Sequence, residues 1–129
     1  MVKDEHSALK ASFERALEFL NAGDHIMAEK ICRRAIKEVS NSDPNIQVLL
    51  CVSLIRQGRS GSAVKRLKHI LRSFPDFAPA HEELGNALLA QNKPDKAIEA
   101  FKKALQLRPN NASAMIKLGK IFSQLGRKD

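Results

Sequence analysis

The sequence predicts an all-α fold in which antiparallel helix pairs stack into a solenoid. The pattern of small and apolar residues in the stretch 78–111, APAHEELGNALLAQNKPDKAIEAFKKALQLRPNN, recurs before and after it with a period of 34 residues, and a further copy near the N-terminus fits with one extra residue. A residue type that accepts the left-handed conformation ending a helix stands at the same place in each copy, as Gly23, Gly58, Asn92 and Gly126. These observations predict a tandem array of helical hairpins.

Each hairpin is expected to contain a first and a second helix. The first helices are predicted over 9–22, 44–57, 78–91 and 112–125, and the second helices over 25–39, 59–73 and 94–107. Paired helices approach closely only where both carry small side chains. Such residues recur at one position in each kind of helix: Ala16, Cys51, Gly85 and Gly119 in the first, and Ala28, Ala63 and Ala97 in the second. Asp43 before Pro44, and Asn111 before the last helix, are typical N-cap residues.

Together with the closing Pro75 and Pro109, this pattern resembles the tetratricopeptide repeat family from about Leu9 to the end of the chain. The resemblance implies a right-handed superhelical solenoid of about three and a half repeats, at 9–43, 44–77, 78–111 and a half-repeat at 112–129, after a lead-in at 1–8. It also implies a non-catalytic protein–protein interaction scaffold that binds a peptide or a helix in its concave groove.

Composition fits this class. The charged N-terminus MVKDEH is followed by no apolar run of signal-peptide or membrane-spanning length, so the predicted location is cytoplasmic without a membrane span. Cys32 and Cys51 fall on core-facing positions, where cysteine acts as a small apolar residue. Both are interpreted as structural.

The groove should be lined by the first helices. Its lining passes from apolar in the first two repeats to polar in the last two, and the candidate partner-binding residues are Leu17, Leu49, Val52, Glu83, Asn86 and Lys117. Contiguous exposed apolar surface in a soluble protein usually marks a binding site. The alternative is that a tight superhelix lets the apolar members pack on one another.

Tetratricopeptide domains that grip the C-terminal carboxylate of chaperones use Lys, Asn and Arg on the first helices. Here the matching positions hold Phe13, Leu17, Leu49, Pro79 and Glu83. The residues therefore predict that this carboxylate clamp is absent.

Positive charge is concentrated on the second helices. With flanking Lys93 and Arg108 they carry +10, more than the +8 of the whole chain, and the candidate basic convex face consists of Arg33, Arg34, Lys65, Arg66, Lys68 and Arg72. An ordinary solvated face is the simpler interpretation, because the chain has no Trp or Tyr to stack on bases. The alternative is an anionic partner such as nucleic acid.

No enzyme site emerges from the sequence. There is no phosphate loop, no metal-ligand spacing among the four histidines, and no nucleophile with a positioned base. Adjacent Glu82 and Glu83 would point about 100° apart on a helix, so they do not form an acid–base pair. No catalytic residue, cofactor or metal is therefore predicted.

The C-terminal half-repeat keeps the apolar pattern through Leu118, Phe122 and Leu125 and stops where its partner helix should begin. Arrays normally end in a cap with a polar outer face. We therefore expect either that the chain is the N-terminal piece of a longer protein or that self-association covers the open end. The segment FPDFAPAHEELGNALL also resembles N-terminal repeat segments of bacterial proteins that carry a downstream sulfotransferase domain. That resemblance implies an accessory domain of a larger enzyme.

Overall fold

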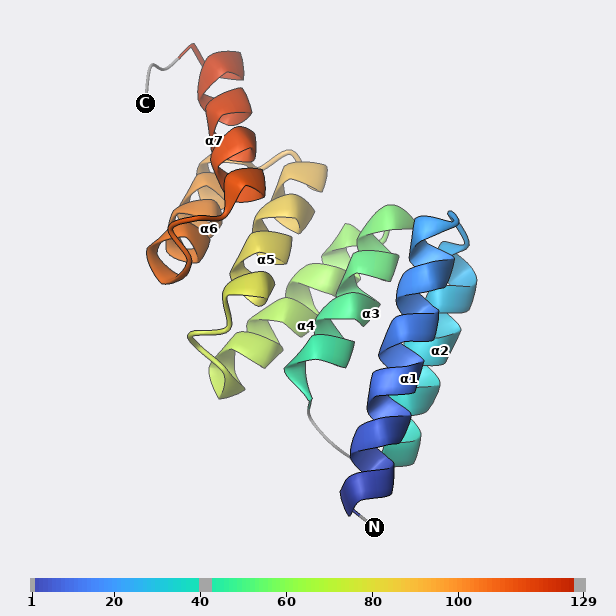
Figure 1. The fold of residues 1–129 in the computed structure, drawn as a ribbon. Coiled ribbons are helices and arrows are strands. Elements are labelled where there is room, and N and C mark those ends of the chain that lie inside the picture. Colours follow the sequence, from blue (N-terminus) through green and yellow to red (C-terminus); the bar gives the residue numbers. More distant parts are fainter. Residues whose placement is uncertain (1, 40–42, 127–129) are drawn as a thin grey trace.

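The computed structural model describes residues 2–39 and 43–126. Over these residues the chain forms seven α-helices and no strand (Figure 1): α1 (Val2–Asn21), α2 (His25–Val39), α3 (Pro44–Arg56), α4 (Ser60–Ser73), α5 (Ala78–Ala90), α6 (Pro94–Leu107) and α7 (Ala112–Gln124). This confirms the predicted all-α class.

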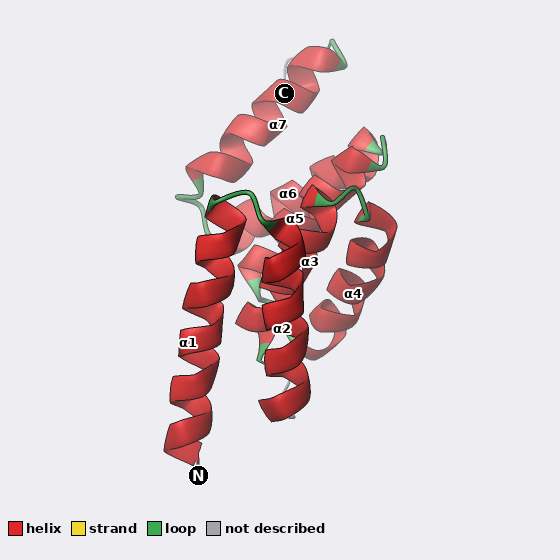
Figure 2. Cartoon of the chain, turned by 90° about the vertical axis from the view of Figure 1, so that its right-hand side faces the viewer, coloured by secondary structure: helices red, strands yellow, loops and turns green. Residues whose placement is uncertain are grey.

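The helices form two layers. Helices α1, α3, α5 and α7 follow one another on one side, and α2, α4 and α6 lie behind them (Figures 1 and 2). Each helix packs against the next in sequence, and α1 with α3 and α3 with α5 also meet across neighbouring hairpins. The arrangement is the predicted solenoid of helix pairs, with the first helices in one layer and the second helices in the other.

Helix boundaries lie close to the predicted ones. Helices α2 and α6 have the predicted limits, and α1, α3, α5 and α7 each end one residue early. In α3, α5 and α7 the expected last residue is already the C-cap. Helix α1 begins at Val2, so the described part of the predicted lead-in continues the first helix.

The predicted turn positions adopt the left-handed conformation. The φ angles are 88° at Gly23, 79° at Gly58, 61° at Asn92 and 73° at Gly126. A side chain on Cβ makes this region costly, so glycine and asparagine are favoured there. The predicted N-caps are confirmed too, since the side chain of Asp43 accepts from the Asn45 N–H at 2.8 Å and Asn111 accepts from the Ala114 N–H at 3.1 Å.

Small residues allow the paired helices to approach. Ala16, Ala28 and Ala97 are fully buried. A Cβ atom on Gly85 would lie 2.7 Å from Cζ of the buried Phe101 ring, well inside van der Waals contact. The helices α5 and α6 therefore approach closely at Gly85.

A cluster around Glu29 joins the first two repeats. Its carboxylate, on a side chain that is 12% exposed, accepts from Arg33 Nε at 2.7 Å, Arg59 Nη1 at 3.0 Å and Gln57 Nε2 at 2.9 Å. Burial alone would raise the pKa of Glu29, but these hydrogen bonds outweigh it and hold the pKa below its ordinary value. The carboxylate is thus stabilised in its charged form, linking α2 to the end of α3 and the start of α4.

Candidate functional site: a groove lined by the first helices

Helices α1 and α3 and the start of α5 surround a hollow of about 320 Å³. Its floor is apolar, with Phe13 and Leu17 from α1, Leu49 and Val52 from α3, and Phe77 from the segment before α5. This is the part of the layer where the sequence predicts an apolar groove.

The three predicted apolar residues lie together in this hollow but differ in exposure. Leu17 is 39% exposed and Val52 is partly buried, whereas Leu49 is only 6% exposed. Leu49 is part of the buried core, on a helix that packs against both α1 and α5. The tight-superhelix alternative thus describes Leu49, while Leu17 and Val52 supply the accessible apolar surface.

Of the predicted polar residues, only Glu83 lines the hollow. The Asn86 amide donates to Glu83 Oε1 at 3.0 Å and so helps to fix the orientation of the Glu83 carboxyl group. Lys117 Nζ lies 3.9 Å from Glu82 Oε2 and 5.9 Å from the centre of the Phe101 ring. The structure therefore brings four of the six predicted residues together in the hollow. Asn86 contacts one of them, Glu83, and Lys117 lies near Glu82 and Phe101 instead.

Burial raises the pKa of Glu83 above its ordinary value. The Asn86 hydrogen bond and the positive charges of Lys117 and Arg56 act in the opposite direction without cancelling the effect of burial, and Glu82 adds to it. Glu83 is a carboxyl group at the edge of an apolar hollow, where a hydrogen-bond donor or cation of a partner would stabilise its charged form.

Sequence reasoning missed Arg56 and Phe77. Arg56 lines the hollow, and its Nη1 lies 3.4 Å from the Leu20 carbonyl oxygen. It follows Val52 by four residues, so helical spacing already placed it on the same face. Phe77 lies in a loop between two repeats. The only feature of the sequence that indicated a place in the groove was its apolar side chain in that segment.

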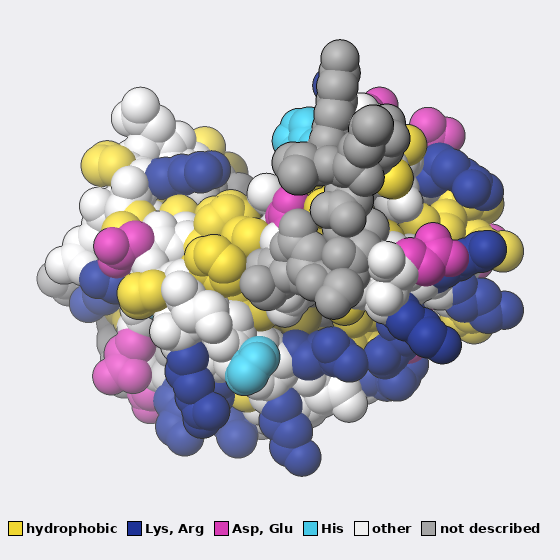
Figure 3. Space-filling model, turned by 90° about the horizontal axis from the view of Figure 1, so that it is seen from below, with side chains coloured by type: hydrophobic (Ala, Val, Ile, Leu, Met, Phe, Trp, Pro, Cys, Tyr) yellow, Lys and Arg dark blue, Asp and Glu magenta, His cyan; other side chains and the backbone are white. Residues whose placement is uncertain are grey.

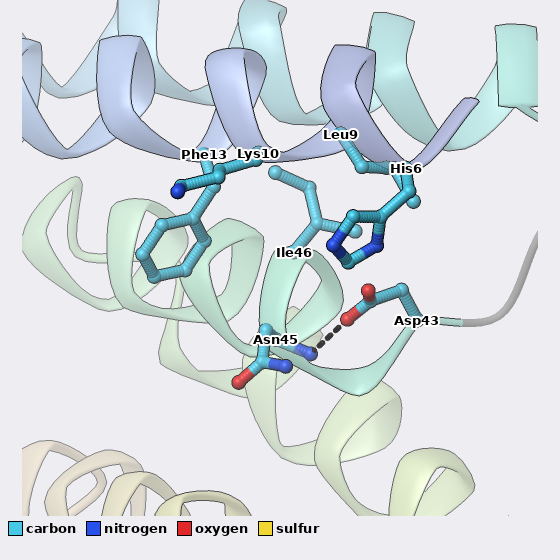
Figure 4. Close-up of a pocket in the computed structure, with 7 residues that line it drawn as sticks. All are labelled: His6, Leu9, Lys10, Phe13, Asp43, Asn45 and Ile46. Carbon is cyan, nitrogen blue, oxygen red and sulfur yellow. Dashed lines mark hydrogen bonds between the residues drawn. The ribbon is translucent and has the colours of Figure 1, made fainter. Parts of the chain in front are cut away.

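A second hollow of about 220 Å³ opens between α1 and the start of α3 (Figure 4). His6, Lys10 and Phe13 of α1 lie above Asn45 and Ile46 of α3, with Leu9 and Asp43 also in the lining. Phe13 and Asn45 line both hollows. The two hollows therefore adjoin along the α1–α3 contact.

The positions matching a carboxylate clamp are grouped in the groove. The larger hollow is lined by all of them: Phe13, Leu17, Leu49, Pro79 and Glu83. None of these five positions carries a basic side chain. The groove of this chain thus offers apolar and acidic groups where a clamp offers cations.

The predicted basic face divides into paired and unpaired residues. Arg33 Nε lies 2.7 Å from Glu29 Oε2, and Arg34 Nε lies 2.8 Å from Glu38 Oε1. No described carboxylate forms an ion pair with the four predicted residues on α4, which are all exposed: Lys65, Arg66, Lys68 and Arg72. Figure 3 shows Lys and Arg side chains gathered along one side of the molecule.

Helix α7 and its C-cap residue Leu125 expose apolar side chains. Met115 is 49% exposed, Ile116 58% and Leu125 40%. A Cβ on Gly119 would meet no atom within 4 Å, unlike one on Gly85 at the same position of the repeat.

Within residues 2–39 and 43–126, no group of three His, Cys, Asp or Glu side chains could hold a metal ion, and no helix combines the length and hydropathy of a membrane span. Cys32 and Cys51 are free and fully buried, and burial raises the pKa of each thiol to about 12.

The chain is similar to known helical-repeat proteins. The family model described as TPR repeat matches residues 85–126. The Saccharomyces cerevisiae anaphase-promoting complex subunit CDC16 is 25% identical over 107 residues, which cover 78% of this chain and 13% of that protein. The chain spans only 5–13% of the length of the curated relatives it matches.

Two solved structures share the fold. The first TPR domain of human RPAP3 superposes with a TM-score of 0.84 at 20% identity, covering 95% of this chain and 94% of that one. The first TPR of Spaghetti (RPAP3), bound to the HSP90 peptide SRMEEVD, gives a TM-score of 0.81 at 20% identity and covers 95% of each chain.

Proposed function

The chain belongs to the tetratricopeptide repeat family, and we propose that it is a non-catalytic scaffold binding a peptide or helix of a partner protein in the groove between α1, α3 and α5. The observation that carries this proposal is the accessible apolar surface of Leu17 and Val52 inside a hollow with a polar rim. Peptide binding by a repeat domain of the same fold supports it.

The lining defines the partner's chemistry. Leu17 and Val52 would contact an apolar side chain of the partner, and burying one large aliphatic side chain contributes about 1.5–3 kcal/mol. Arg56 and Glu83 at the rim would bind polar groups beside this anchor. The matching positions hold no cation for a terminal carboxylate, so an internal apolar segment fits better than an acidic C-terminus.

The test begins with a peptide displayed on phage and selected on the wild-type protein. We expect Leu17→Asp and Val52→Asp each to weaken its binding at least about tenfold, or roughly 1.4 kcal/mol, because each places a charge on the apolar floor. The matched control is Ile26→Asp on α2, which also charges an exposed aliphatic residue, 59% exposed, outside the hollow.

Isothermal titration with the selected peptide measures binding, and circular dichroism checks folding. Unchanged affinity in both groove variants, or equal loss in the Ile26→Asp control, would exclude this groove. A large fall in the melting temperature of Val52→Asp would instead mean that Val52 is a core residue. Leu17→Asp, whose side chain is 39% exposed in the wild type, then carries the test.

The second candidate is an accessory domain of a larger protein. It is favoured by the small share of each curated relative that this chain covers. The groove would then position the rest of that protein on its partner or substrate. A downstream sulfotransferase domain, self-association through α7 and the cytoplasmic location stay predictions. The intact mass of the native protein tests the accessory-domain candidate, which requires a mass above the 14.3 kDa of this chain.

A further inference from the structure

The outer face of α4 differs in charge pattern from its neighbours in the same layer. Helix α2 carries two acidic residues, and each of them pairs with an arginine four residues away. Helix α6 mixes Asp95 and Glu99 with its lysines. Helix α4 contains basic residues and no acidic residue at all.

The cations of α4 lie along one side of the helix. Lys65, Lys68 and Arg72 follow one another at spacings of three and four residues, which places them on one stripe, and His69 lies between them. Arg66 flanks the stripe, and all five side chains are exposed. Like charges at these spacings repel and destabilise a helix. The arrangement therefore lowers the stability of α4, and no ion pair with a described carboxylate compensates along the stripe.

Arg59 provides an internal comparison. It precedes α4 and meets a described carboxylate, since its Nη1 lies 3.0 Å from Glu29 Oε1 across the repeat boundary. Arg59 thus joins two repeats through an acidic partner. The stripe on α4 has none among the described residues.

We propose that the outer face of α4, formed by Lys65, Arg66, Lys68 and Arg72, binds the phosphate backbone of duplex nucleic acid independently of base sequence. Basic residues clustered along one helix of a chain with net charge +8 are the electrostatic pattern of such binding. The face has no Trp, Tyr or Phe for stacking, so it contacts phosphates and does not read single-stranded bases. This proposal concerns the layer opposite the groove and does not depend on the groove's function.

A bilayer fits this face less well. No apolar side chain stands within the stripe to enter the lipid interface. The helices on either side bring acidic residues of α2 and α6 to the same layer. A narrow, strongly charged ridge suits a phosphate strand better than a broad anionic surface.

The experiment measures fluorescence anisotropy of a labelled mixed-sequence 16-base-pair DNA duplex titrated with the protein at 50–200 mM NaCl. Four phosphate contacts predict a slope of log affinity against log salt of roughly −3.6, hence about a 150-fold loss of affinity between 50 and 200 mM NaCl. The variant Lys65→Gln/Arg66→Gln/Lys68→Gln/Arg72→Gln should lose at least tenfold in affinity at 50 mM and most of the salt slope.

The matched control removes an equal number of positive charges from the flanking helices, as Lys30→Gln/Lys37→Gln/Lys96→Gln/Lys103→Gln. All four of these lysines are exposed, on α2 and α6. It should bind more tightly than the α4 variant, and circular dichroism should show both folded. Equal losses of affinity in the two variants would mean that duplex binding depends only on the net charge of the protein, and would overturn the proposal. So would the absence of duplex binding at 50 mM, or tighter binding to phosphatidylserine vesicles or to poly-glutamate than to the duplex.

Discussion

Replacing Gly85 by alanine tests how closely α5 and α6 approach. The added Cβ would lie 2.7 Å from Cζ and 2.8 Å from Cε1 and Cε2 of Phe101, whose side chain is 0% exposed. Such overpacking costs about 1–3 kcal/mol because the buried ring has no free space to move into. Alanine is favoured over glycine in a helix interior by about 1 kcal/mol. We therefore expect Gly85→Ala to lower the free energy of unfolding by roughly 0–2 kcal/mol.

Gly119→Ala is the matched control. Gly119 occupies the same position one repeat later, and a Cβ there would meet no atom within 4 Å. Only the helix-propensity term applies, so the variant should gain about 1 kcal/mol. The difference between the two variants isolates the steric term, at about 1–3 kcal/mol. Urea unfolding followed by far-ultraviolet circular dichroism measures both.

A double-mutant cycle with Phe101→Leu identifies the group responsible. Leucine lacks the Cε and Cζ atoms that the new Cβ would approach, so adding Gly85→Ala to this background should cost less than in the wild type. Equal stabilisation by Gly85→Ala and Gly119→Ala would refute the reasoning, because it would mean that α5 and α6 do not meet at this position.

Four further predictions concern titration, reactivity and local stability. Burial raises the pKa of Glu83, so the native state gains stability as pH falls through that pKa. Glu83→Gln should therefore raise the melting temperature at pH 7.5, and near pH 4 the variant and the wild type should melt at similar temperatures. The pKa of Glu29 is lowered, so the charged carboxylate stabilises the native state above the ordinary carboxyl pKa, and this stabilisation disappears in acid. Glu29→Gln should therefore lower the melting temperature at pH 7, and its difference in melting temperature from the wild type should become smaller by pH 3. Cys32 and Cys51, with pKa values raised to about 12, should react with Ellman's reagent at pH 8 only after unfolding, as about one thiol in 10,000 is ionised natively. Amide hydrogen exchange should be faster in α7 than in α5, since α7 packs chiefly against α6 whereas α5 packs against α3, α4 and α6.

The elements predicted best from sequence were those set by the backbone. The turns at Gly58 and Asn92 need positive φ, and few residue types accept it, so the requirement is visible in the sequence itself. The same holds for the caps at Asp43 and Asn111, whose short polar side chains reach the first N–H groups of the next helix. Local chemistry determines both features.

The groove was only partly predictable because its shape depends on how successive hairpins are rotated. Helical spacing placed Leu49 beside Val52, but the packing of neighbouring helices around α3 decides that Leu49 is only 6% exposed. Lys117 was predicted to face the groove, and its position above Phe101 and near Glu82 arises from contacts between repeats. Side-chain pairing of this kind depends on distances between neighbouring repeats, which the sequence period does not specify.

Gly85 and Gly119 show how far repeat periodicity can be used as evidence of contact. The sequence assigns both residues to the same close-approach position. In the structure Gly85 meets a buried aromatic ring, whereas Gly119 faces open space on a helix that also exposes Met115 and Ile116. Periodicity therefore identifies where a contact would form, and only the neighbouring helix decides whether it exists. The same reasoning applies to the cations on α4. Their spacing alone fits a solvated face, and only the structure shows that no carboxylate among the described residues pairs with them.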